Sequence, residues 1–349
     1  MKAKILNTTL LISIATALVS GCSMRDPRFR LLAQSQTGLI SSNANNKVDI
    51  LWVIDNSGTM GPKQDNLATS INSFMSQFKN KGLDYKIGVV TTDIRPVDPL
   101  HPTDPNFSGQ DGCIVNATGH PKVILPSNSN AATDLASNAQ VGFYGDSNAQ
   151  SLNVVEKALS SPNHSTGGCN EGFLRSNAFL AVVFFSDADD NSTGTVNGLV
   201  SFLDGIKPPT TLDNGLKVRS YFTSGMIVDD LAKPECVALG PFSEVGYKFL
   251  DIANATKGIT SSICDADFSD GLLALSTKIL ESTTAVHLSR EPDESTIVVY
   301  ADLKMVPKDN SDGWSFDSQT NSIVFHGSYI PTSSSVELII NYTPKDIVR

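Results

Sequence analysis

The feature that most constrains the fold is an apolar run at residues 48–54, which stops abruptly at Asp55. Such a run is typical of a central strand that is buried on both faces of a parallel sheet. Side chains with short, oxygen-bearing groups follow it directly, at Asp55, Ser57 and Thr59. Ligands of open α/β sheets bind beyond the carboxyl ends of the strands, so these three side chains lie where a site is expected.

The spacing of these residues favours a metal ion. Oxygens at positions i, i+2 and i+4 of an extended turn can converge on one hard cation, and a carboxylate with two neutral hydroxyls suits Mg²⁺, or Mn²⁺ or Ca²⁺ in its place. The plainer alternative is a capped turn, because Asn, Ser, Gly and Thr are also ordinary turn and helix-cap residues. Their position between a buried strand and a helix favours the metal site.

The stretch Asp55-Asn56-Ser57-Gly58-Thr59 resembles the first motif, Asp-x-Ser-x-Ser/Thr, of the metal-ion-dependent adhesion site in von Willebrand factor A domains. The resemblance covers roughly residues 45–283 and implies a doubly wound, mostly parallel α/β sheet of the VWA or Rossmann-like type. It also implies a third loop with an Asp directly after a later strand. Asp187 matches that position, because it follows the apolar run 179–186. A merely solvated acidic loop would not explain this placement.

The second metal loop is where this sequence departs from the family, which places a threonine at the start of a helix. No threonine stands at residues 145–150, ahead of the helical pattern that begins near Leu152. We predict Ser147 as the ligand there, with Ser151 or Asp146 as alternatives. Equally, Asp146 and Ser147 would serve as caps of that helix.

The first residues predict export and a lipid anchor. Two lysines precede an apolar run at residues 10–19 that is too short to cross a bilayer as a mature helix, so residues 1–21 are expected to be a signal peptide. The run ends in Val-Ser-Gly-Cys at residues 19–22, which resembles the lipobox of bacterial lipoproteins and implies acylation, by palmitate for example, of Cys22. Ser23, in place of Asp, implies the outer membrane. The alternative is an ordinary signal peptide with an unrelated cysteine.

The net charge of the chain excludes some classes of binding partner, and its cysteines indicate the cellular compartment. The net charge is −10, and removal of residues 1–21, with Lys2 and Lys4 and no acids, makes it −12. This disfavours nucleic acid and anionic lipid surfaces as partners. The four remaining cysteines lack the close pairs of a zinc site and are expected to form two disulfides in an oxidising compartment. Proximity along the chain favours Cys113 with Cys169 and Cys236 with Cys264.

The pattern along the chain predicts three segments after the signal peptide. They are a polar tether at 22–46, an α/β domain at 47–283 with an insertion at about 94–144 pinned by a disulfide, and a small antiparallel β domain at 284–349. Within the insertion, a short hairpin is expected around Val115 and residues 123–125. The alternation of strand and helix patterns stops near Thr284, which sets the last boundary.

Together these features predict an envelope-anchored protein of the adhesion type that is not an enzyme. A cation held by Asp55, Ser57, Thr59 and Asp187 would bind an acidic side chain of a protein partner.

One alternative is an envelope scaffold that uses no metal. Another is a phosphatase of the haloacid-dehalogenase type, but Ser57 stands where such enzymes have their acid, and a hydroxyl does not protonate a leaving group near neutral pH. None of the five histidines lies in a recognisable catalytic motif, although spacing alone does not exclude a triad assembled in space.

Overall fold

The computed structural model describes residues 36–38, 45–79, 81–96, 100, 109–211, 215–237, 243–333 and 335–345. The predicted signal peptide and Cys22 lie outside the described residues, as does most of the predicted tether. None of the helices in the described ranges combines the length and the apolar content needed to cross a membrane.

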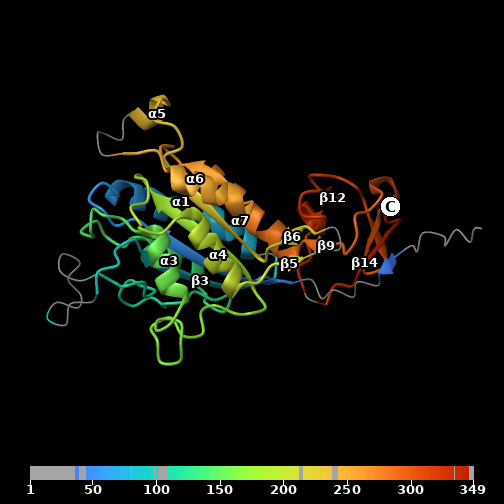
Figure 1. Ribbon diagram of the computed structural model, residues 1–349, viewed down its shortest axis with the longest axis horizontal. Helices are drawn as coiled ribbons and strands as arrows, with labels where there is room; N and C mark the ends of the chain where they lie inside the picture. Colours follow the sequence, from blue (N-terminus) through green and yellow to red (C-terminus); the bar gives the residue numbers. More distant parts are fainter. Residues whose placement is uncertain are drawn as a thin grey trace, which may run out of the picture.

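The centre of the molecule is a five-stranded parallel sheet with the strand order β3-β2-β4-β7-β8 (Figure 1). The apolar run at residues 48–54 belongs to β2, which lies between β3 and β4 and is almost wholly buried. The strands are β2 (Lys47–Ile54), β3 (Asp84–Thr91), β4 (Phe179–Ser186), β7 (Tyr221–Ile227) and β8 (Thr260–Ser262). The predicted doubly wound α/β class is therefore the observed one.

Helices cover both faces of this sheet and enclose two separate cores. Successive side chains of β2 point alternately into one core and the other. Trp52 and Ile54 lie in one core, and Leu51 and Val53 lie in the other. The first core is closed by α1 (Gly61–Lys79), α2 (Ala131–Ala139) and α7 (Ser269–Thr284). The second is closed by α3 (Ser151–Leu159), α4 (Val196–Ile206) and α6 (Tyr247–Thr256). Burial on both faces explains why the run is apolar at every position except Asp49.

The chain order creates a switch point beside β2. From β2 the chain passes through α1 to β3 on one side, and it then returns through α3 to β4 on the other side. Ligand crevices of open α/β sheets form at such points, outside the carboxyl ends of the strands. Asp55 follows β2 and Asp187 follows β4, so both stand at this crevice.

The insertion differs from the predicted hairpin. Val115 and Ile124 do not pair with each other: each makes an antiparallel bridge to β3, with Val89 and Ile87 respectively. The free edge of β3 offers unpaired backbone groups, and these two bridges satisfy some of them. Helix α2 was also not expected in this stretch. The disulfide from Cys113 to Cys169, with 5.6 Å between the Cα atoms, ties the insertion to the segment before β4.

The second disulfide joins Cys236 of the short helix α5 (Pro234–Val237) to Cys264 after β8. Both disulfides have the pairing that proximity along the chain predicts. A small hairpin of β5 (Thr210–Thr211) and β6 (Lys217–Val218) precedes β7.

The C-terminal region consists of antiparallel sheets, as expected, and lies at one end of the long axis in Figure 1. Residues 36–38, which the sequence places in the tether, form β1 and pair with β14. The hydrophobic core continues from α1 and α7 into these sheets without a break, through Phe325 and Leu338 among others. One sheet contains β1, β14 (Leu338–Tyr342), β10 (Val298–Ala301) and β11 (Lys304–Val306); the other contains β12 (Trp314–Asp317), β13 (Ser322–Phe325) and β9 (Val286–His287).

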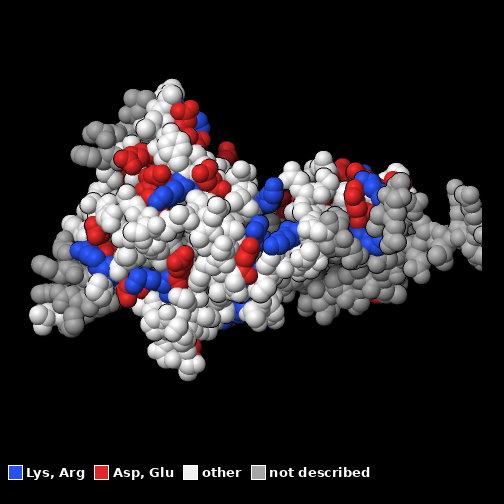
Figure 2. Space-filling model, in the orientation of Figure 1, with Lys and Arg blue, Asp and Glu red and all other residues white. Residues whose placement is uncertain are grey.

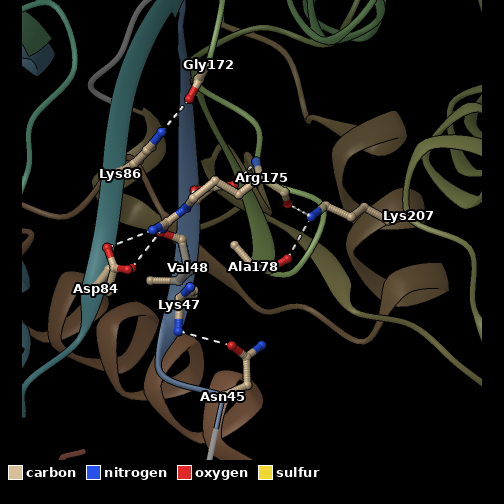
Figure 3. Close-up of polar contacts among 10 residues, drawn as sticks. Asn45, Lys47, Val48, Asp84, Lys86, Gly172, Arg175, Ala178 and Lys207 are labelled. Carbon is tan, nitrogen blue, oxygen red and sulfur yellow. Dashed lines mark hydrogen bonds and ion pairs between the residues drawn. The ribbon is translucent and has the colours of Figure 1, made fainter. Parts of the chain in front are cut away.

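An ion-pair cluster centred on Arg175 fastens the amino ends of the strands (Figure 3). The Arg175 side chain donates to Asp49 Oδ1 at 2.8 Å and to Asp84 Oδ1 at 2.7 Å, which links β2 to β3. Its backbone N–H donates to Asp49 Oδ2 at 2.6 Å. The buried ammonium of Lys207 donates to the backbone oxygens of Arg175 and Ala178, so this buried charge is also partnered.

Candidate metal centre

The candidate site is built where β2 and β4 end side by side. The backbone N–H of Asp55 donates to the carbonyl of Phe185 at 2.9 Å, which continues the parallel register by one residue. Asp55 and Asp187 are both fully buried, with 0% exposure. Two strands that are far apart in sequence therefore present carboxylates to the same small volume.

Hydrogen bonds bring the other two predicted ligands to these carboxylates. Thr59 Oγ1 donates to Asp187 Oδ1 at 3.0 Å, across 128 residues of sequence. The backbone N–H of Ser57 donates to Asp55 Oδ1 at 2.8 Å. Ser186 Oγ donates to Asp55 Oδ2 at 2.7 Å. Asp55, Ser57, Thr59 and Asp187 thus form one cluster in the described structure.

The electrostatics of this cluster favour a cation. Burial raises the pKa of the Asp55 carboxyl above its ordinary value, hydrogen bonds from Ser186 and Ser57 lower it, and the nearby charge of Asp187 raises it further. The net pKa shift is upward, so an ionised Asp55 is disfavoured in the protein alone. A bound divalent ion would remove that cost, because it supplies the missing opposite charge.

Lys63, in the first turn of α1, supplies one positive charge that the sequence did not predict. Its ammonium donates to Asp187 Oδ2 at 2.7 Å and to the backbone oxygen of Thr59 at 3.0 Å. The lysine side chain is 12% exposed and the aspartate side chain 1% exposed. The i+4 spacing from Thr59 was the available signal, since it places Lys63 on the side of the helix that faces the motif. A metal ion bound to Asp187 would compete with this ion pair.

Ser147, the predicted ligand of the second loop, is exposed. Its loop meets the site through the backbone instead: the N–H of Gly145 donates to the carbonyl of Asn56 at 2.8 Å. A Cβ at position 145 would lie 2.3 Å from the Asn56 side chain, so the approach requires glycine. Asp146, one of the two alternatives, accepts the Asn148 N–H at 3.0 Å and closes a turn.

The buried hydroxyls near the site that have no hydrogen-bond partner in the described structure include Thr92 Oγ1 and Ser151 Oγ. Thr92 follows β3, and its N–H donates to the carbonyl of Ile54 at 3.2 Å, directly before Asp55. Ser151 begins α3, and the preceding residue, Gln150, donates to the Thr92 carbonyl at 3.1 Å. Unsatisfied buried oxygens are costly unless something binds them, so they fit a site completed by a cation. Ser151 is one of the alternatives named from the sequence, whereas Thr92 is not among them.

Other carboxylates at this edge have partners that hold them in structural roles. Asp93 forms an ion pair with Arg95 at 2.6 Å. Asp190 accepts the Leu152 N–H at 3.2 Å at the start of α3 and pairs with Lys248 at 3.4 Å. Within the described ranges, no place gathers three or more His, Cys, Asp or Glu side chains as a metal cage. The donor set is therefore two carboxylates with hydroxyls, which suits a hard cation that retains water.

No family model matches the chain, and neither does any curated protein. Among solved structures it is similar to a von Willebrand factor type A protein from Catenulispora acidiphila, with 11% identity, a TM-score of 0.37 and coverage of 87% of this chain and 59% of that one. It is also similar to the pilus adhesin SpaC from Lactobacillus rhamnosus GG, with 13% identity, a TM-score of 0.39 and coverage of 85% and 38%.

A third similar structure is proximal thread matrix protein 1 from the mussel byssus, in a form whose MIDAS motif is occupied by zinc. The identity is 11% and the TM-score 0.37, with coverage of 70% of this chain and 50% of that one. In each of these comparisons the chain spans less than two thirds of the length of the solved chain.

Proposed function

We propose that this chain is a protein-binding module of the adhesion type, with a divalent cation at the carboxyl edge of its sheet. The observation that carries the proposal is the pair of fully buried carboxylates, Asp55 and Asp187, at the ends of adjacent strands with the hydroxyls of Ser57 and Thr59 beside them. Buried like charges without enough counter-charge cost stability, and sites of function are where such costs are tolerated.

The residues of this chain have separate roles in the proposed site. Asp55, Ser57, Thr59 and Asp187 would hold the ion, which we propose to be Mg²⁺ or a close relative. When bound, the ion would supply positive charge for an acidic side chain of a partner protein. Neutral hydroxyl ligands neutralise little of the charge of the ion, so the ion would attract the carboxylate of the partner more strongly.

Exposed aromatic side chains near the site offer a surface for the rest of the partner. Phe143 and Tyr144 are 43% and 54% exposed, and their ring centroids are 4.7 Å apart. The Phe143 ring lies against Gly61, at the start of α1: a Cβ atom added to Gly61 would be 3.1 Å from the ring. Tyr247, at the start of α6, is 65% exposed. Aromatic side chains are the usual anchors of protein interfaces, so we propose these three as contacts around the metal-bound carboxylate.

We further propose that the chain is held at the bacterial outer membrane through an acylated Cys22. This proposal rests on the apolar run and the lipobox-like residues 19–22. One acyl chain alone gives marginal binding, so stable retention requires the several chains of a lipoprotein anchor. Fractionation of cells that carry Cys22→Ala tests it, and retention of the variant in the membrane fraction would contradict it.

A second candidate function is an envelope scaffold that needs no metal. The observation in its favour is the ion pair between Lys63 and Asp187 at 2.7 Å, because a fixed ammonium already compensates one of the two carboxylates. In that case the carboxyl edge would be a stable part of the fold, and the protein's contacts would lie elsewhere on its surface.

Calorimetry and thermal unfolding with Mg²⁺ or Mn²⁺ separate these two functions. We expect saturable binding and a higher melting temperature for the wild type, because a ligand that binds only the folded state stabilises it. Asp55→Asn should abolish both effects while the variant still folds. Capture of envelope proteins with and without a chelator then tests the partner. A wild-type melting temperature that does not respond to either ion, with no heat of binding, would leave the scaffold as the better account.

A further inference from the structure

A cavity of about 510 Å³ lies between α7 and the C-terminal sheets, away from the candidate metal centre. This volume is in the range of small-molecule sites, which occur preferentially where two structural units meet. Phe179 and Tyr221, which begin β4 and β7, line the cavity. The cavity is therefore at the amino edge of the parallel sheet, the opposite edge from Asp55.

Three side chains in the wall of this cavity form a continuous hydrogen-bonded series. His326 Nε2 is 2.7 Å from Ser315 Oγ, and His326 Nδ1 is 2.6 Å from Glu281 Oε1. Glu281 belongs to α7, Ser315 belongs to β12, and His326 directly follows β13. All three residues line the cavity. The residues are not near one another in sequence, so only the fold brings them together.

The direction of these hydrogen bonds follows from the donors and acceptors present. An ionised Glu281 can only accept, so the proton on the His326 ring lies on Nδ1. Nε2 of the neutral ring is then an acceptor, and the Ser315 hydroxyl donates to it. A hydroxyl that donates to an imidazole, which is in turn oriented by a carboxylate, is the arrangement of an activated serine nucleophile.

A second serine–histidine pair in the same sheet, Ser322 and His287, differs from Ser315 and His326 in its exposure to solvent. Ser322 Oγ also hydrogen-bonds a histidine, at His287 Nδ1, but Ser322 is fully buried. Ser315 is partly exposed, as are the side chains of His326, at 13%, and Glu281, at 24%. A substrate can therefore reach Ser315 but not Ser322.

The charge of the cavity indicates the class of substrate. Its basic lining residues, Lys217, Arg219, Lys257 and Lys278, outnumber its two acids, Glu281 and Asp317, and the apolar side chains of Phe179 and Phe222 lie beside them. Figure 2 shows Lys and Arg side chains gathered on this face where the α/β part meets the C-terminal sheets. In a chain with a net charge of −10 such a grouping favours a ligand that is negatively charged and partly apolar.

We propose that Ser315, His326 and Glu281 hydrolyse carboxylic esters whose acyl part carries a negative charge. Ser315 Oγ forms a bond to the ester carbonyl carbon while its proton passes to His326 Nε2. The ester C–O bond then breaks, and the alcohol leaves with that proton. A water molecule gives a proton to Nε2 and attacks the acyl carbon, Ser315 Oγ leaves and recovers the proton, and the carboxylic acid is released. Glu281 is a positioning residue that holds the imidazole in the required tautomer.

Two probes test this activity on the whole folded protein. A fluorophosphonate should label the wild type covalently, and mass spectrometry should place the label on the peptide that contains Ser315. Hydrolysis of mono-p-nitrophenyl adipate, which carries a free carboxylate, should be faster than that of p-nitrophenyl acetate. Ser315→Ala should lose labelling and at least about a hundredfold of the rate, because it removes the nucleophile. The matched control Ser322→Ala should keep both.

Further variants separate a positioning role from a structural one. Glu281→Gln should lower kcat with KM unchanged, Glu281→Asp should restore part of it, and both should keep the wild-type melting temperature within a few degrees. Lys278→Gln should reduce the preference for the charged ester by about threefold to tenfold. A chelator should change none of these results, because the metal centre is at the other edge. A label on another residue of the wild type, or no label at all, would overturn the proposal.

Discussion

At the amino edge of the parallel sheet the buried carboxylate Asp49 meets the guanidinium of Arg175, whereas at the carboxyl edge the buried carboxylate Asp55 meets hydroxyls and a second acid. Both carboxylates are fully buried, and burial raises the pKa of both. Arg175 opposes the shift at Asp49, while Asp187 adds to the shift at Asp55. The amino edge thus carries a counter-charge beside its buried acid, whereas Asp55 has only hydroxyls and a second acid, and this difference is the basis for proposing that a cation binds at the carboxyl edge.

The largest effect is expected at the amino edge. Arg175→Met leaves Asp49 buried without its partner and should lower the free energy of unfolding by about 3–5 kcal/mol at neutral pH. The matched control is Lys86→Met, which removes one hydrogen bond to the Gly172 carbonyl and should cost about 1 kcal/mol or less. Urea unfolding of the two variants and the wild type measures the difference.

The pH dependence of Arg175→Met follows from the same carboxylate. The pKa of Asp49 is raised by burial in the folded chain, and loss of Arg175 removes the contacts that lower it. A carboxyl with a raised pKa contributes stability that is complete below its unfolded value and is lost as pH rises through the folded value. The deficit of the variant should therefore be smaller at pH 4.5 than at pH 7.5, and an equal deficit at both would show that Asp49 is not its source.

A smaller effect is expected for Lys63→Met at the carboxyl edge. The ammonium of Lys63 lies 2.7 Å from Asp187 Oδ2 and would compete with a metal ion bound there. Its removal should lower stability in chelator by about 1–3 kcal/mol, because a nearly buried acid loses its partner. The affinity for Mg²⁺ should rise about tenfold, or about 1.4 kcal/mol. Lys304→Met, at an exposed position in β11, is the control for loss of a positive charge.

The same variant distinguishes the two functions proposed for this edge. If the edge binds metal, saturating Mg²⁺ should restore the melting temperature that Lys63→Met loses in chelator. If the ion pair is only structural, Mg²⁺ should leave the variant as unstable as before. Weaker binding of Mg²⁺ by the variant would show that Lys63 supports the ion instead of competing with it.

What the sequence predicted well is what hydrophobic pattern and local spacing determine. The runs at 48–54 and 179–186 are apolar except for Asp49 and Ser186, because both faces of these strands are covered, so the strand ends before Asp55 and Asp187 were placed correctly. Helix α2 was missed because only four of its nine residues are buried, two of them polar, so it shows little apolar periodicity. Pairings that depend on the third dimension could not be predicted.

Polar contacts at both edges are what the sequence did not predict. Lys63 and Arg175 look like ordinary surface residues in sequence, and only the packing of distant segments gives them buried partners. Thr92 was passed over because the second-loop ligand was sought after residue 145, although the end of β3 is adjacent to Asp55 in space. Hydroxyls carry no hydrophobic pattern, so sequence offers little to rank Ser147 against Thr92.

The smallest effect is expected from variants that compare Thr92 with Ser147 as the oxygen that supports the metal ion. Thr92 Oγ1 is buried without a hydrogen-bond partner in the described structure, whereas Ser147 is exposed. Thr92→Val keeps the shape and removes the oxygen, so it should leave stability in chelator unchanged or raise it by up to about 1 kcal/mol. It should also weaken Mg²⁺ binding by up to about tenfold, as loss of a supporting oxygen does at metal sites. Ser147→Ala should change neither quantity. If calorimetry finds the reverse, with Ser147→Ala weakening the ion and Thr92→Val leaving it intact, then the second loop must close over the site when metal binds, and the contrast between a finished amino edge and an incomplete carboxyl edge would extend to the backbone of residues 142–148.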